Sequence, residues 1–347
     1  MMPAISVIIT AYNVAKFIET CVDSLRLQTF RNFEAVIIDD CSSDKTFELV
    51  RDKYTNFNGE KYDPRIRIYK NIRNVGYAGL NVNKAMSLID PLSKYVYIID
   101  SDDILTEDCL ESLYEGAEKS RADIVIMNEY YYTFDQGFSM PDIRDLIKFP
   151  QKLPAPFTVP NDIVDRLQGG LINGWIPGVN WLKLYRHDFF VNSGLYFPQI
   201  LGIEDFFSNI AGICLAEKIF ITPACCYIYR QRPDSVMRFS ADKQLINIMG
   251  NFVNVIPYLE EFLTRTTLSE ENRLIVKSYA VATLIQERIV RYGLSLEEIN
   301  DILLKVTTER SAIAPEVSHY LIQALTYILS FHFYKKADRK ELFQLVR

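Results

Sequence analysis

The sequence lacks the features that mark several common classes of protein. Its 347 residues contain no Cys-x-x-Cys pair, and its six cysteines and three histidines are scattered, so we expect neither a disulfide framework nor a zinc site. No apolar run approaches the length of about 18 residues that a membrane-spanning helix needs. There is also no low-complexity tract and no fixed-period repeat. The composition is that of an ordinary globular protein. The length allows two to three domains, or one large α/β domain with an appendage.

The charge balance argues against a nucleic-acid partner. The chain has 38 Lys and Arg residues against 44 Asp and Glu residues, and no stretch is rich in basic side chains. The opening "MMPAISVIITAYN" has no basic region before its apolar run, so we expect no signal peptide. The expected lack of a signal peptide and the scattered cysteines together favour a cytoplasmic protein.

One segment near the C-terminus leaves two interpretations open. The stretch "YLIQALTYILSFHFYKK", residues 320–336, combines aromatic side chains with a basic end, which is typical of a helix at a membrane interface. Polar residues interrupt its apolar side chains, so we favour a buried helix with a solvated basic end over an interfacial helix. The segment therefore predicts either a packed helix or peripheral contact with the inner face of the cytoplasmic membrane.

Residues 5–128 alternate between short apolar runs and helix-like segments. The apolar runs are "ISVIITA", "FEAVIID", "RIRIYKN", "YVYIID" and "ADIVIMN". Nearly continuous β-branched runs are typical of parallel strands that are covered on both faces. The alternation therefore predicts an α/β fold with a mostly parallel sheet and helices on both faces.

The pattern also divides the chain. Residues 1–240 form the predicted α/β domain, with one half over 1–130 and the other over 131–240. A proline-rich, irregular stretch from about residue 130 to about residue 175 is typical of long functional loops. Residues 241–347 show only helical periodicity, and we interpret them as a helical packing or docking appendage.

Acidic residues follow the apolar strands at the points where the strands end. The motif "YIIDSDDIL" places Asp100, Asp102 and Asp103 after the fourth run, and Asp39 and Asp40 end the second run. Ligands of open α/β sheets bind beyond the carboxyl ends of the strands. Because neighbouring carboxylates repel one another at neutral pH, such a cluster needs open solvent or a cation.

Motifs exclude several ligands but leave alternatives. There is no GxGxxG and no GxxxxGK[ST], and an EF-hand loop counted from Asp100 would place Leu105 at its glycine position. An aspartate-nucleophile phosphotransferase would use Asp100 to attack phosphorus. A nucleoside-diphosphate site would use Asp102 to hold a divalent cation that also binds both phosphates. The cluster could also simply cap the helix that follows.

The longer sequence context resembles a known family. The stretch "SVIITAYNVAKFIETCVDSLRLQTFRNFEAVIIDDCSSDKT" resembles the opening of glycosyltransferase family 2, whose members have the GT-A fold, and "YIIDSDDIL" sits where that family has its DxD motif. The stretches "NWLKLYRHDFFVNSGLYFP", "GIEDFFSNI" and "YIYRQRPDSVM" resemble the second half of the same domain in bacterial polysaccharide and surface-glycan transferases. The resemblance implies a nucleotide-binding half over 1–130 and an acceptor half over 131–240.

The resemblance implies a donor site that draws on both halves. Its nucleotide- and donor-binding residues would be Thr10, Ala11, Tyr12, Asp40, Arg73, Asp100, Asp103, Arg230 and Arg232. Asp40 would accept a hydrogen bond from the N–H of a uracil ring, and Arg230 and Arg232 would hold the diphosphate. Asp100 would contact the ribose or support the site from behind, and Asp103 would face the sugar or the acceptor.

It also implies a metal and a base. Asp102 would hold Mn²⁺ or Mg²⁺, and Asp205 in "GIEDFFSN" would be the general base, with Glu204 as its neighbour. Acidic residues are also favoured at the exposed start of any helix, so only the surrounding motif supports the catalytic interpretation. The chain departs from the family where "NVGYAGLNVNKA" places Asn81 at a position at which arginine is common.

The implied function is an inverting, metal-dependent transfer of a sugar. The donor would be a UDP-sugar, and the acceptor would be a glycan such as a lipid-linked or cell-surface polysaccharide precursor. One base and one displacement imply inversion at the anomeric carbon. Two alternatives stay open, namely the aspartate-nucleophile phosphotransferase and a non-catalytic protein that binds nucleotide-sugars.

Overall fold

The structure is a computed structural model, and its description is confined to part of the chain. It describes residues 2–127, 129–134, 146–148, 155–167, 176–199, 204–231, 258–273, 276–277 and 280. The chain divides into two compact units, of which the first comprises Met1–Asn161 and Gly174–Phe239 and the second comprises Asp162–Asn173 and Ser240–Arg347. The domain boundary at residue 240 stays a prediction.

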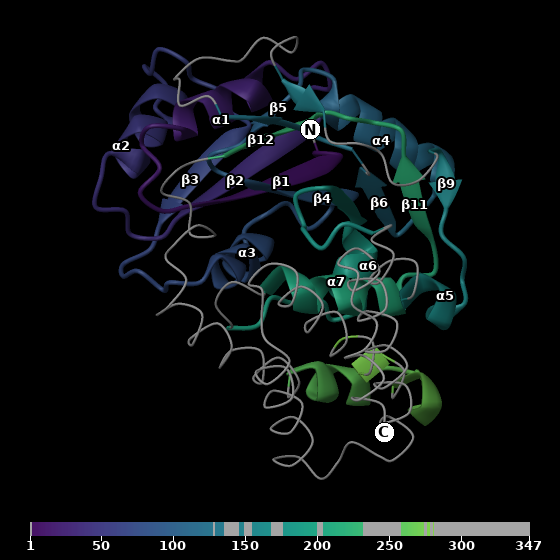
Figure 1. The fold of residues 1–347 in the computed structure, drawn as a ribbon. Coiled ribbons are helices and arrows are strands. Elements are labelled where there is room, and N and C mark those ends of the chain that lie inside the picture. The colour runs from purple at the N-terminus through teal and green to yellow at the C-terminus, as the bar shows by residue number, and fades with distance from the viewer. Residues whose placement is uncertain are drawn as a thin grey trace, which may run out of the picture. The chain divides into compact units, whose positions relative to one another are not determined.

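A large sheet forms the centre of the first unit (Figure 1). Its strands are β1 (Ile5–Ala11), β2 (Phe33–Asp39), β3 (Ile66–Lys70), β4 (Tyr95–Asp100), β6 (Ile124–Met127), β9 (Phe157–Thr158), β10 (Lys183–Arg186) and β11 (Ile219–Thr222). Their order is β3-β2-β1-β4-β10-β6-β11-β9. The first four strands in this order run parallel, β10 is antiparallel to both neighbours, β11 is parallel to β6, and β9 is antiparallel to β11.

Helices cover both faces of this sheet. The first unit contains α1 (Ile18–Arg26), α2 (Thr46–Val50) with the π-helical turn η1 (Arg51–Thr55), α3 (Ala78–Met86), α4 (Cys109–Ser120), α6 (His187–Asn192) and α7 (Glu204–Leu215). Figure 1 shows α1, α2 and α4 on one side of the strands and α3, α6 and α7 on the other. The predicted α/β fold with a mostly parallel sheet is therefore confirmed, and the strands are nearly continuous in apolar character because neither face meets water.

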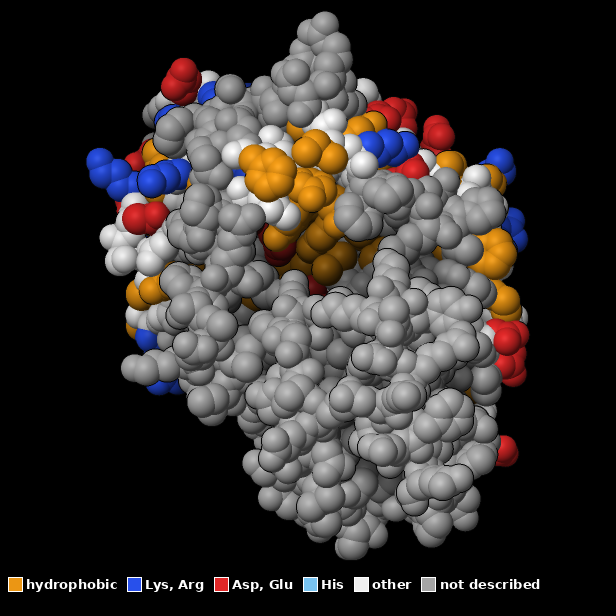
Figure 2. Space-filling model, viewed as in Figure 1, with side chains coloured by type: hydrophobic (Ala, Val, Ile, Leu, Met, Phe, Trp, Pro, Cys, Tyr) orange, Lys and Arg blue, Asp and Glu red, His pale blue; other side chains and the backbone are white. Residues whose placement is uncertain are grey.

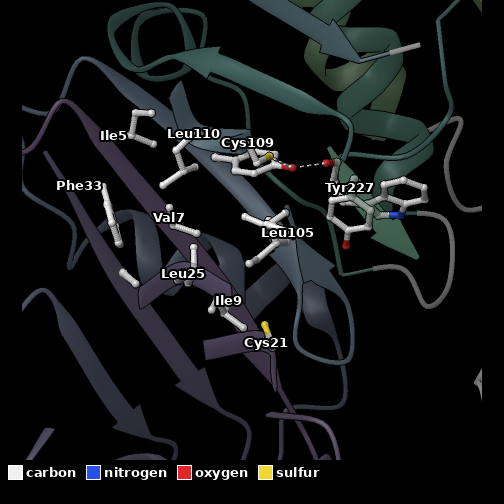
Figure 3. Close-up of a cluster of buried hydrophobic side chains, with 14 of the residues drawn as sticks. Ile5, Val7, Ile9, Cys21, Leu25, Phe33, Leu105, Cys109, Leu110 and Tyr227 are labelled. Atoms are coloured by element: carbon white, nitrogen blue, oxygen red, sulfur yellow. Dashed lines mark hydrogen bonds between the residues drawn. The ribbon is translucent and has the colours of Figure 1, made fainter. Parts of the chain in front are cut away.

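Buried hydrophobic side chains fill the space between the large sheet and the helices α1 and α4 (Figure 3). Val7 and Ile9 of β1 pack with Cys21 and Leu25 of α1, and Leu110 of α4 belongs to the same buried cluster. Full burial of one such side chain stabilises the fold by about 1.5–3 kcal/mol. The layer therefore fixes α1 firmly against the strands whose ends carry the acidic residues.

A second, smaller sheet joins distant segments of the first unit. Its strands are β5 (Ile104–Leu105), β7 (Tyr131–Thr133), β8 (Ile147–Lys148) and β12 (Tyr227–Arg230), in the order β5-β12-β7-β8. Strand β12 runs antiparallel to β5, with Tyr227 opposite Leu105 and Ile228 opposite Ile104. Because β5 follows the acidic motif directly, this pairing brings β12 beside that motif.

The second unit is described only in part. It includes α5 (Ile163–Leu167), and residues 258–264 and 270–273 are helical. The segment 320–336 and most of the predicted helical region lie outside the described residues. Within the described part of the chain, no helix combines the length and the apolar character that crossing a membrane requires.

Candidate functional site

The parallel strands end in register at one edge of the large sheet. Thr10 lies opposite Ile38 of β2 and opposite Asp100 of β4, and Ala11 lies opposite Asp39. The segments that follow β1, β2 and β4 therefore leave the sheet side by side. This arrangement places Thr10 and Ala11 next to the start of the acidic motif, at the edge where α/β sheets bind ligands.

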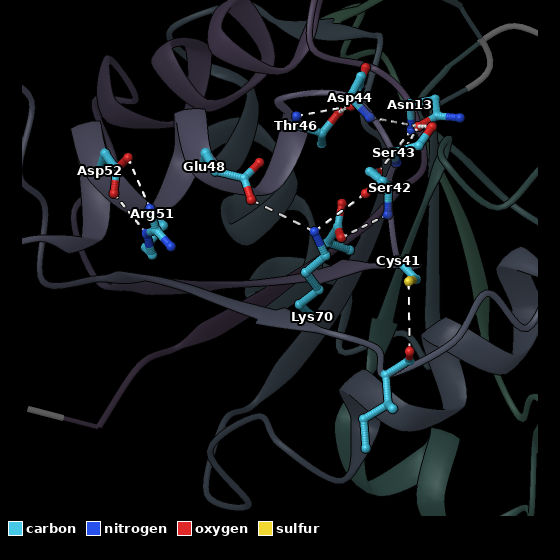
Figure 4. A network of polar contacts seen from close by, with 12 residues as sticks. Asn13, Cys41, Ser42, Ser43, Asp44, Thr46, Glu48, Arg51, Asp52 and Lys70 are labelled. Atoms are coloured by element: carbon cyan, nitrogen blue, oxygen red, sulfur yellow. Dashed lines mark hydrogen bonds and ion pairs between the residues drawn. The ribbon is translucent and has the colours of Figure 1, made fainter.

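The loops after β1 and β2 are tied together by polar side chains (Figure 4). Asn13 has a positive φ of 51°, and its Oδ1 accepts hydrogen bonds from the backbone N–H of Ser43 at 2.9 Å and of Asp44 at 3.3 Å. The Ser42 hydroxyl accepts the Asn13 N–H at 2.9 Å. Tyr12, which precedes Asn13, is 50% exposed. The loops are thus ordered by their own contacts while the Tyr12 ring stays accessible.

Asp40 organises the loop that follows β3. Its carboxylate is 4% exposed, and its Oδ1 accepts the side-chain amide of Asn71 at 2.7 Å and the backbone N–H of Val75 at 2.9 Å. Its Oδ2 accepts the backbone N–H of Gly76 at 3.0 Å, where φ is +74°. Since each carboxylate oxygen can accept two hydrogen bonds, Oδ2 keeps acceptor capacity after these contacts. Arg73 lies exposed on the same loop.

Asn81 extends the Asp40 network and does not reach outward. It is buried on α3, and its Oδ1 accepts the Asn71 amide at 2.8 Å. Lys84, one turn later on α3, donates to Asn71 Oδ1 at 2.6 Å. Asn81 is therefore part of a buried amide network in which Lys84 supplies the nearby positive charge.

The three aspartates of the acidic motif differ sharply in their surroundings. Asp100 is exposed, Asp102 is half-buried, and Asp103 is only 1% exposed. The Asp103 Oδ2 accepts the Tyr227 hydroxyl at 2.6 Å, and its Oδ1 accepts the Arg230 N–H at 2.8 Å. Burial, with repulsion from Asp102 and Asp100, raises the pKa of Asp103 well above its ordinary value. The predicted contact of Asp103 with sugar or acceptor stays a prediction, and this burial does not favour it.

Arg230 lies behind the acidic motif. Its side chain is 1% exposed, its terminal nitrogens both donate to the Thr20 hydroxyl of α1 at 3.3 Å, and its guanidinium lies 5.2 Å from the centroid of the Phe17 ring. The structure therefore places this cation beneath α1 and not on an open surface. Its predicted role in holding a diphosphate stays a prediction, and Arg232 lies outside the described residues.

Asp205 stands in the first turn of α7, and a polar cage holds its carboxylate. Oδ1 accepts the Asn180 side-chain amide at 2.6 Å, and Oδ2 accepts the Asn180 backbone N–H at 3.4 Å. Tyr185 donates its hydroxyl to Asn180 Oδ1 at 2.6 Å, which turns the amide nitrogen toward Asp205. The side chain of Glu204, the first residue of α7, lies outside the described residues.

The charge of Asp205 depends on burial and on one lysine. Burial raises the pKa of Asp205, while the hydrogen bonds from Asn180 and the charge of Lys183 oppose this rise. Lys183 is itself buried, which lowers its pKa to about 7, and its amine donates to the carbonyl oxygens of Pro177 and Val179. A carboxyl in this setting holds a proton more readily than an exposed one.

The site offers oxygen ligands but no complete metal cage. Among the described residues, no group of three or more His, Cys, Asp or Glu side chains is arranged to hold a metal ion. Figure 2 shows hydrophobic side chains gathered around a hollow on the viewed face, with acidic side chains deeper inside. A cation at the acidic motif would need further ligands from a bound anion. Mg²⁺ is commonly bound in this way, by one or two carboxylates together with phosphate oxygens of the substrate.

Comparisons with known proteins point to one family. The sequence model of "Glycosyl transferase family 2" matches residues 6–170. The chain is 28% identical to the uncharacterized glycosyltransferase EpsJ of Bacillus subtilis over 68% of this chain and 63% of EpsJ, so it spans less than two thirds of that relative. It is also 28% identical to the glycosyltransferase GlyG of Streptococcus pneumoniae over 70% of this chain and 75% of GlyG.

A solved structure shares the fold. The crystal structure of Staphylococcus aureus TarS 1–349 in complex with UDP-GlcNAc superposes with a TM-score of 0.64 at 19% identity, and the match covers 94% of this chain and 91% of TarS 1–349. This likeness agrees with the GT-A fold that the sequence motifs predict.

Replacing Asp40 with alanine should disorder the loop after β3. The variant D40A leaves the N–H groups of Val75 and Gly76 without their acceptor, and we expect the free energy of unfolding to fall by about 2–4 kcal/mol. Urea unfolding measures this loss, and amide hydrogen exchange at the two residues should accelerate. The matched variant D52A, which removes an exposed carboxylate from η1, should change neither. Unchanged exchange in D40A would contradict the anchoring role.

Proposed function

We propose that the chain transfers a sugar from a UDP-sugar to a glycan acceptor such as a lipid-linked or cell-surface polysaccharide precursor, because the model of glycosyltransferase family 2 matches residues 6–170 and the relatives it resembles are glycosyltransferases. The observation that carries this proposal is the register of β1, β2 and β4, whose ends bring the loops after Ala11 and Asp39 beside the acidic motif. The TarS structure, which was solved with UDP-GlcNAc, supports a uridine donor.

The nucleoside would bind between the first two loops. Thr10 and Ala11 end β1 at this edge, and the exposed ring of Tyr12 offers an aromatic face for a base. Asp40 Oδ2 retains capacity for one more donor, which suits the ring N–H of uracil. Arg73, exposed on the loop that Asp40 anchors, would approach the same nucleotide.

Asp102 would hold Mn²⁺ or Mg²⁺, as the sequence motif implies. We extend this assignment to Asp100, which the resemblance placed at the ribose or behind the site, as a second carboxylate at the same cation. Carboxylate oxygens are the ligands that these cations prefer. The Asp103 carboxylate is buried, and it accepts hydrogen bonds from the Tyr227 hydroxyl and the Arg230 backbone N–H. When bound, the cation would neutralise the negative charge that develops on the departing diphosphate. Asp102 and Asp100 would be the carboxylate ligands of the cation. Phosphate oxygens and water would supply its other ligands.

Asp205 would act as the general base. The acceptor hydroxyl would attack the anomeric carbon, its proton would pass to the Asp205 carboxylate, and the bond from that carbon to the diphosphate oxygen would break. The raised pKa of Asp205 suits this role because the carboxylate must hold the proton that it receives. One displacement with one base inverts the anomeric configuration.

Replacing Asp205 with asparagine should slow transfer by orders of magnitude without removing donor binding. General base catalysis contributes a factor of about 10² to 10⁴ to the rate, and we expect the turnover of D205N to decrease by a factor in this range. The measurement is UDP release from a panel of UDP-sugars with a glycan acceptor. The control D188N changes an exposed aspartate in the first turn of α6 and should keep wild-type turnover. Turnover of D205N within a few-fold of wild type would reject the assigned base.

Replacing Asn180 with alanine should shift the pH profile of kcat/KM. Activity falls at low pH as Asp205 becomes protonated, and the Asn180 hydrogen bonds lower the Asp205 pKa by favouring the charged form. Their removal in N180A should raise that pKa and move the acidic limb to higher pH. The control N209A deletes an amide that donates to the Asp205 carbonyl and not to its carboxylate, so its limb should stay in place. A limb that shifts to lower pH in N180A would contradict this account.

A further inference from the structure

The hydroxyl of Tyr227 bridges both flanks of the acidic motif. The backbone N–H of Asp100 donates to this hydroxyl at 3.3 Å, and the hydroxyl donates to the Asp103 carboxylate at 2.6 Å. Asp102 lies between the two attachment points. The same motif is closed internally by a hydrogen bond from the Asp103 N–H to the Asp100 carbonyl at 3.2 Å. One phenol thus fixes the beginning and the end of the turn.

Tyr227 is itself immobilised by its neighbours. Its ring stacks on Trp181 with centroids 4.4 Å apart and planes at 19°, and the Trp181 carbonyl accepts the Tyr97 hydroxyl at 2.9 Å. On the backbone, β12 pairs with β5, and the Thr106 N–H donates to the Cys226 carbonyl at 3.0 Å. The stacking on Trp181 and the pairing of β12 with β5 therefore fix the position of the Tyr227 hydroxyl. A hydroxyl fixed in this way can restrict the motion of the acidic motif that it contacts.

The turn needs such an anchor because its charges oppose order. Three carboxylates within four positions repel one another, and a flexible turn would relieve the repulsion by spreading. The Asp103 carboxylate is buried and accepts two hydrogen bonds, so it contributes attachment and not an open ligand. Groups that orient metal ligands from behind commonly change metal affinity by about 10- to 100-fold when they are removed.

We propose that Tyr227 is a positioning residue for the cation- and diphosphate-binding turn, and that Asp103 is the point through which it acts. This inference rests on the proposed function, because the ligand that benefits is the UDP–cation pair. Tyr227 makes no contact with the ligand in this scheme. It keeps Asp100 and Asp102 at the spacing that a shared cation requires.

The test removes one hydroxyl. In Y227F, the affinity for UDP in the presence of Mn²⁺, measured by isothermal titration calorimetry, should fall about 10- to 100-fold, while the affinity for uridine without metal should stay unchanged. Amide hydrogen exchange over residues 100–103 should accelerate. The control Y95F deletes the tyrosine hydroxyl at the other end of β4, which donates to Glu118 at 2.9 Å, and should leave both quantities at wild-type values.

The outcomes separate this inference from the proposed function. If wild type binds no UDP with or without Mn²⁺, the proposed function fails, and the exchange rates of residues 100–103 still test the anchor. If wild type binds UDP with Mn²⁺ and Y227F binds it within twofold of wild type with unchanged exchange, the positioning role is overturned. If thermal melting shows that Y227F is unfolded, D103N replaces it, since asparagine keeps the volume and one acceptor. The Mn²⁺-dependent affinity of D103N for UDP should then fall below that of wild type, and an affinity within twofold of wild type would overturn the positioning role.

Discussion

The hydrogen bond from Tyr227 to Asp103 joins parts of the chain that are 124 positions apart, and the order of the acidic motif depends on it. A buried carboxylate is costly unless hydrogen bonds compensate for lost water. Here the Tyr227 hydroxyl and the Arg230 N–H provide that compensation, and both come from β12. The strand can occupy this position because β5 offers it a backbone partner directly after the motif. Fold and site are thus coupled through one short strand.

Much of the first unit could be predicted because its signals are local. The runs that became β1 to β4 are apolar at nearly every position, which is what a strand covered on both faces requires. Parallel strands of similar length end together, so the meeting of Thr10 with Asp100 follows from the pattern. The wider motifs pointed to glycosyltransferase family 2, and the model of that family matches residues 6–170.

The hydrogen bonds that join distant segments of the site could not be predicted in the same way. Charged residues after a strand are typical of exposed ends, yet Asp103 and Arg230 are buried because each finds a partner from a distant segment. The same holds for Asn180, whose bond to Asp205 joins a loop before β10 to the start of α7. No local pattern encodes these pairs. The assignments of Arg232 and of the 320–336 segment lie outside the described residues and stay predictions.

We propose that the acidic motif binds UDP together with a divalent cation. Thermal unfolding of the full chain with UDP or GDP, each with and without Mn²⁺, measures this binding. A ligand at about 100 times its dissociation constant stabilises the folded state by about 2.7 kcal/mol, which raises the unfolding midpoint measurably. The account predicts a rise with UDP that requires Mn²⁺ and is absent with GDP. A midpoint that stays constant with every nucleotide, or that rises equally with UDP and GDP, would contradict it.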